Sequence, residues 1–142
     1  MFGPYEREVM YYETDRMGIV HHSNYARWFE EARHKYLEAA GIPYAQVESL
    51  GILIPVLSVE CTYRKAFKYG DVFQVYLQPV KFNGIKAEFT YEVRNKADGE
   101  LYTTGKSSHC FVDEKLQLLN IKKSHPQVYE LFLDPVRDTL GN

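Results

Sequence analysis

Residues 85–94 alternate between apolar and polar side chains without a break. This period of two is typical of a strand in a sheet with one buried face and one solvated face. Asn83-Gly84 and Asp98-Gly99 flank the segment and favour tight type I′ hairpins, because both dipeptides tolerate positive φ. Tyr69-Gly70-Asp71 indicates another reversal. The region from Ile52 to Asp113 is therefore predicted to form a four-stranded antiparallel meander with long strands.

A helical pattern precedes this region. Apolar side chains recur there at helical spacing and form one stripe, which consists of Tyr25, Trp28, Phe29, Ala32, Tyr36 and Leu37. Ser23 is the expected N-cap, because its hydroxyl can accept a hydrogen bond from a free amide of the first turn. Gly41 and Pro43 end the helix. The helix should span about 17 residues, or about 25 Å.

Shorter elements complete the chain. Residues 5–12 resemble a first strand, 44–50 a short helix and 126–133 a closing helix. One long helix and one long sheet must bury each other, so we expect an α+β fold with a curved antiparallel sheet around a central helix. The sheet edges need cover, and pairing of two copies would make a homo-oligomer, a dimer or tetramer.

Length and composition exclude several classes of protein. The 142 residues fit a single domain, 1–142. A net charge of −2 argues against a nucleic-acid partner or a polybasic membrane anchor. No apolar run approaches the roughly 20 residues that span a bilayer, and the first ten residues lack a signal-peptide pattern, so a cytoplasmic location is expected. Cys61 and Cys110 are expected to be small buried hydrophobes, although a disulfide between them is possible.

Residues 12–25 place an acid and two imidazoles in a loop that leads directly into the helix. The first amides of a helix have no partner within it, and the helix dipole adds positive potential there. A carbonyl oxygen at that end would be polarised, as in an oxyanion hole. Gly18 permits a tight turn, and Asp15 is close enough in sequence to face the same point. This pattern suits acyl-transfer hydrolysis, with Asp15 as the nucleophile or as the base for a water.

The same residues also have an ordinary structural interpretation. An Asp before a helix is more often a turn or capping residue, and His21 and His22 are more often solvated or hydrogen-bonded loop residues. Glu30 and Glu31 fit a solvated helix face. The sequence has neither a zinc-type spacing nor a GxSxG motif, so neither a metal site nor a serine triad is expected.

From Tyr12 to Arg33 the chain resembles the hotdog-fold acyl-CoA thioesterases of the 4-hydroxybenzoyl-CoA thioesterase type. The pattern of that family is a strand, then D-x-x-G-[IV]-V-x-[HY]-x-x-Y, then a helix with an E-x-A-R-like segment. The matching residues here are Asp15, Gly18, Ile19, Val20, His22, Asn24, Tyr25, Glu31, Ala32 and Arg33. The resemblance extends more loosely over the rest of the chain.

The resemblance implies a hotdog fold and hydrolysis of an acyl-CoA thioester, with no metal or redox cofactor. It implies that Asp15 is the catalytic carboxylate and that backbone N–H groups around His22 hold the thioester carbonyl, with the His22 side chain as a further candidate for proton transfer. The expected substrate contacts are Gly18, Ile19, Val20, Ser23, Asn24 and Tyr25. In this family the dimer brings one helix start near the partner, and coenzyme A lies along that junction.

Other positions bear on the substrate. Arg64, Lys65 and Lys68 are candidates for the coenzyme A phosphates, which need basic partners, although a solvated strand end explains them equally well. Arg16 and Met17 stand where many relatives carry small residues, which predicts a narrower or differently shaped pocket entrance.

Two rival functions stay open. An acyl dehydratase on the same fold would pair a His with an acid on the central helix, and this helix offers only His34 near Glu30 and Glu38, away from the apolar stripe. A non-catalytic acyl-binding scaffold would use Asp15 only to cap a turn.

Overall fold

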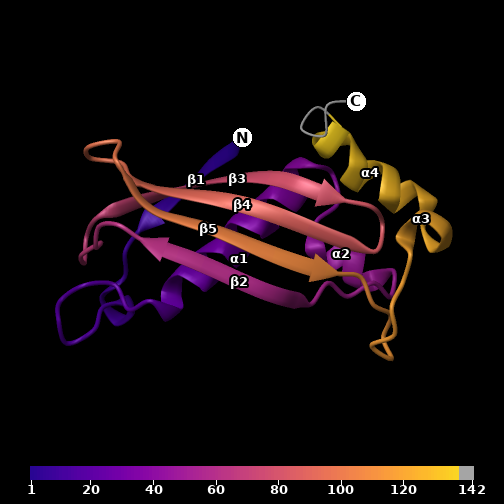
Figure 1. The fold of residues 1–142 in the computed structure, drawn as a ribbon, viewed down its shortest axis with the longest axis horizontal. Helices are drawn as coiled ribbons and strands as arrows, with labels where there is room; N and C mark the ends of the chain where they lie inside the picture. Colours follow the sequence, from indigo (N-terminus) through magenta and orange to yellow (C-terminus); the bar gives the residue numbers. More distant parts are fainter. Residues whose placement is uncertain (138–142) are drawn as a thin grey trace.

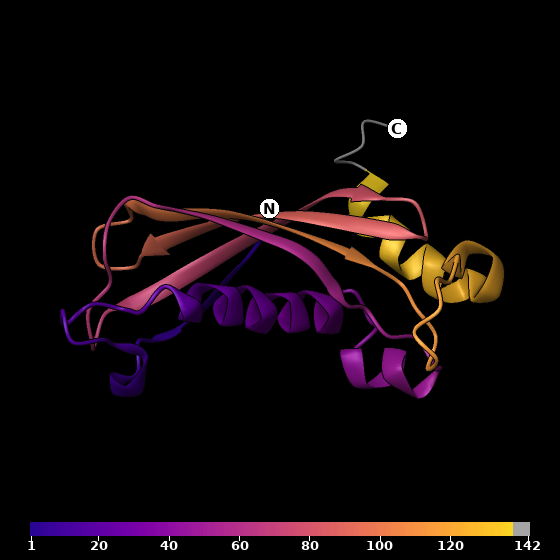
Figure 2. The ribbon, with the colours of Figure 1, turned by 60° about the horizontal axis from the view of Figure 1, so that its bottom comes forward.

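One long helix, α1 (Ser23–Ala39), lies along one face of a five-stranded antiparallel sheet (Figures 1 and 2). The structure is a computed structural model and describes residues 1–137. The strands are β1 (Phe2–Glu8), β2 (Val56–Tyr63), β3 (Val72–Phe82), β4 (Lys86–Asn95) and β5 (Leu101–Cys110). The helix has 17 residues, and every residue of the predicted apolar stripe is buried. The predicted α+β architecture is therefore confirmed.

The order of the strands differs from the predicted meander. The sheet runs β1-β3-β4-β5-β2, so β2 pairs with β5 and not with β3. The connection from β2 to β3 is anchored by Phe67, which is fully buried and packs against the rings of Trp28 and Phe73. Tyr69-Gly70-Asp71 does form the predicted reversal, since Asp71 N–H donates to the Lys68 carbonyl, but this turn ends the crossing segment and does not join two paired strands.

The two predicted hairpins join β3 to β4 and β4 to β5, but neither is a type I′ turn. That turn needs positive φ at two successive residues, whereas only the glycines have it here, with φ of 89° at Gly84 and 71° at Gly99. The Asn83 side chain instead accepts hydrogen bonds from the backbone N–H groups of Ile85 and Lys86. A side-chain acceptor thus closes the first turn.

The first strand is shorter than predicted and begins earlier. It covers Phe2–Glu8, and Tyr11–Glu13 form a 3-10 turn, η1. The Glu13 carboxylate accepts a hydrogen bond from Met10 N–H, which turns the chain away from the sheet. The interpretation of residues 5–12 as one strand was wrong because it did not foresee this turn.

The remaining helices gather at the end of the molecule opposite the loop before α1 (Figure 1). They are α2 (Tyr44–Ser49), α3 (Ile121–Ser124) and α4 (Pro126–Arg137), so the closing helix is longer than predicted. No helix within residues 1–137 is both long and apolar enough to cross a membrane. Cys61 and Cys110 are both free thiols, Cys110 buried and Cys61 half-buried.

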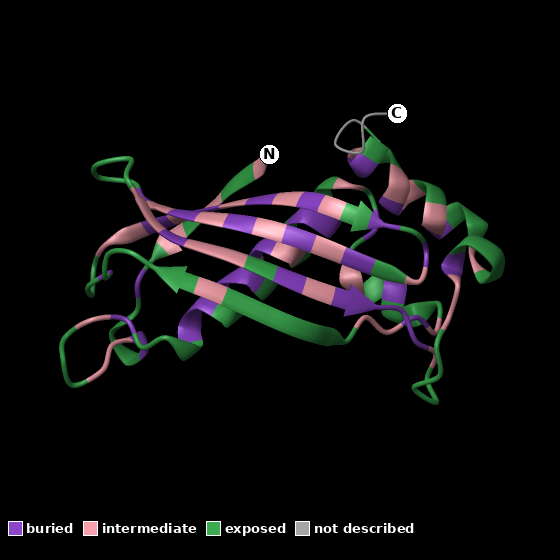
Figure 3. Cartoon of the chain, viewed as in Figure 1, coloured by how far each residue is buried: buried purple, intermediate pink, exposed green. Residues whose placement is uncertain are grey.

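Aromatic stacking joins the helix to the sheet. The Trp28 ring stacks on Phe73 with 3.8 Å between centroids, and the Phe29 ring stacks on Tyr91 at 4.1 Å. Phe29 also fills the space over Gly105, where a Cβ would lie 2.4 Å from the ring. Along β3 and β4 buried residues alternate with more accessible ones, whereas β2 is exposed along most of its length (Figure 3). The edge strand β2 is thus the least covered part of the sheet.

Candidate active site

The loop that carries Asp15 is a tight and internally bonded turn. Thr14 and Val20 pair across its base, and Asp15 N–H donates to the Ile19 carbonyl at 2.8 Å. Gly18 has a φ of 80°, which L side chains rarely adopt, and its N–H donates to the Asp15 carbonyl. The Asp15 side chain accepts through Oδ1 from Met17 N–H at 2.8 Å. Oδ2 of Asp15 accepts no hydrogen bond from any residue that the structure describes, so it is available to a substrate or a water.

Glu13 fixes this loop to the helix. Its side chain is 2% exposed, and its carboxylate accepts from Trp28 Nε1 at 2.8 Å and from both terminal nitrogens of Arg7 at 2.7 and 2.9 Å. Its backbone carbonyl accepts from His21 N–H and from Asn24 Nδ2. One residue therefore ties the first strand, both ends of the loop and the first turns of α1 together.

Arg7 completes the network through a second carboxylate, Glu31. Arg7 Nε lies 2.8 Å from Glu31 Oε1, which also accepts from the Tyr5 hydroxyl at 2.6 Å. Burial alone would raise the pKa of Glu13, but the hydrogen bonds from Arg7 and Trp28 outweigh it and lower that pKa. The hydrogen bonds from Glu13 and Glu31 also raise the pKa of Arg7. The interpretation of Glu31 as a solvated charge was wrong, because Glu31 pairs with the half-buried Arg7, which also binds the buried Glu13.

The start of α1 differs from the prediction at its cap. His22 precedes the helix without a side-chain hydrogen bond to it, and Ser23 is the first helical residue. The Ser23 hydroxyl is within 2.8 Å of His21 Nδ1, which also accepts from Ser23 N–H, so Ser23 does not act as the N-cap. Asn24 N–H donates to the His21 carbonyl. The His22 N–H has no acceptor within residues 1–137, which leaves it as a free amide at the helix start.

A cavity of about 340 Å³ lies beside this helix start. Its lining brings together seven of the predicted catalytic and substrate-contact residues, which are Asp15, Ile19, Val20, His22, Tyr25, Arg64 and Lys65. Met17, predicted at the pocket entrance, and Tyr63 also line it, whereas Arg16 lines a different and more open depression that Asp15 also borders. An acid, a residue of the helix start and two basic residues therefore line one space.

Three expected substrate contacts lie outside this lining. Gly18 shapes the exposed tip of the loop, and Ser23 bonds to His21. Asn24 is 4% exposed, and its amide nitrogen donates to the Glu13 and His21 carbonyls. In this structure these three residues hold the loop and the helix start in place.

The basic side chains at the cavity mouth differ in how they are paired. Lys65 forms an ion pair with Glu100, which raises the Lys65 pKa. Arg64 is exposed and has no carboxylate partner within residues 1–137. Arg64 is therefore better placed than Lys65 to bind an incoming anion. Lys68 does not line the cavity, and its backbone N–H donates to Asp71.

A smaller cavity of about 100 Å³ lies farther along α1, against the other end of β2. Glu30, Arg33 and His34 line it from the helix, and Val56 and His109 line it from the sheet. His109 is 2% exposed and begins a hydrogen-bonded chain through Ser107 and Tyr91 to Arg33. Burial and the positive charge of Arg33 lower the pKa of His109 to about 4.

The pairing that a dehydratase would need is not formed in this smaller cavity. His34 is exposed, and its ring stacks on Tyr44 with 5.1 Å between centroids. Within residues 1–137 no hydrogen bond joins His34 to Glu30 or Glu38, since Glu38 pairs with Lys35. The helix thus presents no bonded His–acid pair.

Sequence reasoning did not find Arg7, Glu13 or Trp28 as parts of the site. Arg7 and Glu13 looked like ordinary polar residues at a strand and in a turn, and Trp28 looked like one more member of the apolar stripe. The signal that could have found them is a Trp on the helix stripe, because a buried indole N–H needs an acceptor. Glu13, the nearest acid before Asp15, supplies that acceptor.

Comparisons with known proteins agree in the class of protein that they find. Residues 9–130 match the family described as the thioesterase-like superfamily. The chain is 38% identical over 122 residues to the "Putative acyl-CoA thioesterase YneP" of Bacillus subtilis, which covers 85% of this chain and 88% of that protein. It is 30% identical over 115 residues to a 1,4-dihydroxy-2-naphthoyl-CoA hydrolase of Prochlorococcus marinus, with 75% of each chain covered. The solved structure of a DHNA-CoA thioesterase from Staphylococcus aureus superimposes with a TM-score of 0.87 at 31% identity, over 94% of this chain and 91% of that one.

Proposed function

The chain belongs to the thioesterase-like superfamily and has its hotdog fold, and from this premise we propose that it hydrolyses an acyl-CoA thioester in the cavity beside Asp15. The observation that carries the proposal is that Asp15, which has a free carboxylate oxygen, and His22, whose N–H has no acceptor within residues 1–137, line one cavity. Relatives named as an acyl-CoA thioesterase and as a 1,4-dihydroxy-2-naphthoyl-CoA hydrolase support the substrate class.

The chemistry follows from the positions of the two groups. The His22 N–H donates to the thioester carbonyl oxygen and stabilises the negative charge that develops there, helped by the positive end of the helix dipole. Asp15 either removes a proton from the attacking water or attacks the carbonyl carbon itself, and both routes need its free oxygen. The carbon–sulfur bond then breaks, and coenzyme A leaves as the thiolate, which takes a proton to become the thiol. In the base route the attacking water supplies that proton through Asp15, and the acid is released directly. In the nucleophile route the acyl group stays on Asp15 as an anhydride, which a water then hydrolyses to the acid and the free carboxylate. Arg64 is the proposed partner of a coenzyme A phosphate.

We propose that the complete site needs two copies of the chain. The edge strand β2 exposes apolar side chains, with Val56, Leu57, Val59 and Tyr63 between 41% and 53% exposed. An unpaired edge of this kind favours pairing with another strand. The Asp15 cavity lies at the Tyr63 end of β2, and the smaller cavity lies at its Val56 end. Antiparallel pairing of two β2 strands would bring the first cavity of one copy next to the second cavity of the other, where Glu30 and Arg33 could contact the acyl group.

The central experiment compares thiol release from a panel of acyl-CoAs by the wild type and by Asp15→Asn. We expect kcat to fall by about two to four orders of magnitude, which is the usual effect of losing a general base. Asp113→Asn is the matched control, because Asp113 also accepts backbone hydrogen bonds in a turn but lies outside the cavity. Equal turnover by the wild type, Asp15→Asn and Asp113→Asn would contradict the proposed role of Asp15. Absence of turnover by the wild type on every acyl-CoA would favour the scaffold function.

A second experiment tests the two-copy site. Val59→Lys places a charge on the apolar edge, and we expect sedimentation equilibrium to show a shift from dimer toward monomer. Turnover should fall in parallel and recover at high protein concentration, because the site is incomplete in one copy. A wild type that is monomeric and fully active would contradict this arrangement.

A further inference from the structure

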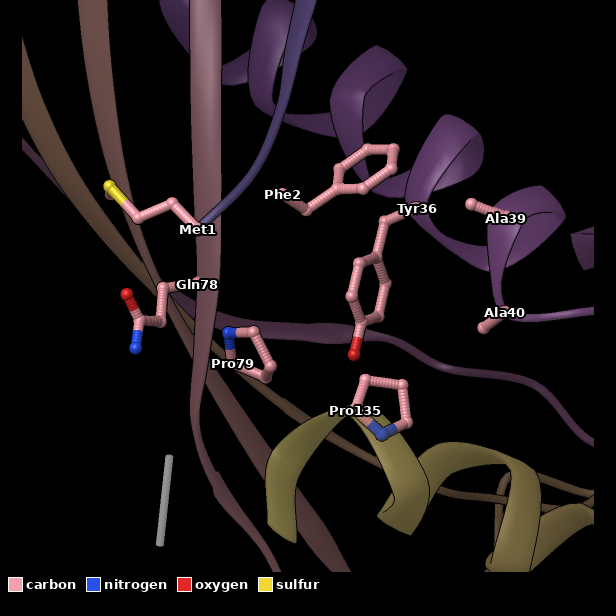
Figure 4. A pocket seen from close by; sticks show the side chains of 8 residues that line it. All are labelled: Met1, Phe2, Tyr36, Ala39, Ala40, Gln78, Pro79 and Pro135. Carbon is pink, nitrogen blue, oxygen red and sulfur yellow. The ribbon is translucent and has the colours of Figure 1, made fainter. Parts of the chain in front are cut away.

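The spaces along α1 differ in the polar groups that line them. The depression at the end of the helix, beside Tyr36 and Pro135, has no charged side chain in its lining (Figure 4). The cavity of about 100 Å³ at the Val56 end of β2 does have one, because Arg33 lines it. This cavity therefore offers a ligand a charged hydrogen-bond donor, which the depression at the helix end does not.

Arg33 is a half-buried cation without a counter-ion. Within residues 1–137 it forms no ion pair, and its hydrogen-bond acceptor is the Tyr91 hydroxyl, 3.1 Å from Arg33 Nη1. A guanidinium carries several N–H donors, so the others are available to a ligand. A positive charge that is partly removed from water costs stability unless an acceptor compensates it.

A chain of three buried side chains holds the Arg33 guanidinium in place. The Tyr91 hydroxyl lies 2.6 Å from Ser107 Oγ, which lies 2.7 Å from His109 Nε2. A guanidinium can only donate, so Tyr91 accepts from Arg33 and donates to Ser107. The Ser107 hydroxyl in turn donates to His109, whose lowered pKa of about 4 keeps the ring neutral and able to accept at pH 7. The chain therefore has one direction, and every link in it is satisfied.

The rest of the lining indicates what kind of acceptor fits. Most of it is apolar, with contributions from Leu37, Ile54 and Phe89. Glu30 lines the same cavity from one turn earlier in α1, but it is exposed, and no ion pair joins it to Arg33 within residues 1–137. A ligand carboxylate would be repelled by Glu30, whereas an uncharged oxygen can accept from Arg33 without that repulsion.

We propose that Arg33 determines substrate specificity by selecting acyl groups that carry an uncharged acceptor oxygen, such as a ketone carbonyl, at a distance from the thioester. This inference rests on the proposed function, in which the smaller cavity of one copy adjoins the Asp15 cavity of the other. The oxygen accepts a hydrogen bond from the guanidinium, and the carbon chain packs against the apolar lining. Tyr91, Ser107 and His109 are positioning residues, because they act on the acyl group through the guanidinium.

The test compares acyl-CoAs that differ in one group. 5-Oxohexanoyl-CoA carries a carbonyl oxygen where 5-methylhexanoyl-CoA carries a methyl group, and the 4-oxopentanoyl and 6-oxoheptanoyl pairs cover a shorter and a longer reach. The measured quantity is the ratio of kcat/KM within a pair, which a general loss of activity does not change. Arg33→Met should lower the largest of these ratios about tenfold, the effect of a hydrogen bond to a charged group.

Two other variants separate specificity from structure. Ser107→Ala breaks the chain behind Tyr91, so it should lower the same ratio by less than Arg33→Met does. Arg27→Met is the matched control, because Arg27 is an exposed cation on the same helix that lines neither cavity, and it should leave the ratio unchanged.

A mixed dimer tests which copy supplies Arg33. It joins one Asp15→Asn chain to one Arg33→Met chain and is purified through a different affinity tag on each. Its working site combines Asp15 of the second chain with Arg33 of the first, so the ratio should return to the wild-type value. A ratio that stays low would place Arg33 in the same copy as Asp15 and would overturn the arrangement.

Other results would also overturn the inference. Equal ratios for the wild type and Arg33→Met in every pair would show that Arg33 does not recognise the oxygen, while the proposed hydrolysis would stand. A higher kcat/KM for glutaryl-CoA, which ends in a carboxylate, than for 5-oxohexanoyl-CoA would contradict the preference for an uncharged group. Absence of turnover by the wild type on every acyl-CoA would refute the proposed function and this inference together.

Discussion

Replacement of Glu13 by Gln tests whether the buried ion network holds the Asp15 loop. The substitution preserves the volume of the side chain but converts one acceptor oxygen into an NH₂ group. In the wild type, Oε1 accepts from Arg7 Nη1 and Met10 N–H, and Oε2 accepts from Arg7 Nη2 and Trp28 Nε1. Whichever way the amide turns, its NH₂ group would face two donors, one of them from the half-buried Arg7 side chain.

The expected loss of stability follows from these contacts. An unsatisfied buried donor costs about 1–3 kcal/mol, and removing one partner of a buried ion pair costs about 3–5 kcal/mol. Arg7 keeps Glu31 as a second carboxylate, and the Gln oxygen keeps two of the four bonds. We therefore expect Glu13→Gln to lower the free energy of unfolding by about 3 kcal/mol, which a domain with about 5–15 kcal/mol of stability survives.

Urea unfolding measures this change, and Glu31→Gln is the matched control. Glu31 also binds Arg7, but its side chain is 33% exposed, so water can replace part of what is lost. We expect the control to lose about 1 kcal/mol or less. Turnover measured well below the unfolding midpoint should also fall in Glu13→Gln, because the Asp15 loop loses its attachment to α1. A Glu13→Gln protein as stable as the Glu31→Gln control would refute this reasoning.

Two further predictions concern the core. Gly105→Ala should lower the free energy of unfolding by about 1–3 kcal/mol, because the new Cβ would lie 2.4 Å from the Phe29 ring. Phe29→Leu in the same chain should recover part of the loss. Thermal denaturation measures both variants, and an unchanged melting temperature for Gly105→Ala would contradict the contact. Burial and Arg33 lower the pKa of His109 to about 4 from 6.5, so the stability that the neutral ring contributes is present above pH 6.5 and is lost as the pH falls toward 4. This amounts to about 3 kcal/mol over that interval, and His109→Gln should show a shallower pH dependence in urea unfolding.

The elements of the fold were predictable where one local pattern decides them. The apolar stripe from Tyr25 to Leu37 can only be the buried face of a helix, and the alternation from 85 to 94 can only be a half-buried strand. Strand order was not predictable in this way, because the pairing of β2 with β5 depends on contacts distant in sequence. Phe67 anchors the crossing segment that this order requires, yet in the sequence it is one aromatic residue among many.

The candidate site was predictable to the extent that it lies on one contiguous segment. Asp15 and His22 are seven residues apart on one loop that leads into α1, and both line the same cavity. Arg64 reaches the same cavity because β2 ends beside the helix start, which the sequence suggested only through its basic residues. The roles of Arg7 and Glu31 depend on the packing of β1 against α1, for which neither residue carries a local signal.

The Asp15 loop gains its rigidity from the core, although loops usually lack the stability of the elements that they connect. Val20 N–H donates to the Phe67 carbonyl, and His21 N–H donates to the Glu13 carbonyl, so both bonds end on buried residues. Glu13 in turn bonds to Trp28, whose ring is stacked in the core. The proposed mechanism requires the free Asp15 oxygen to be held within a fraction of an ångström of its working position. The aromatic core and the ion network are therefore part of the proposed site, because they fix where Asp15 lies relative to the free amide of His22.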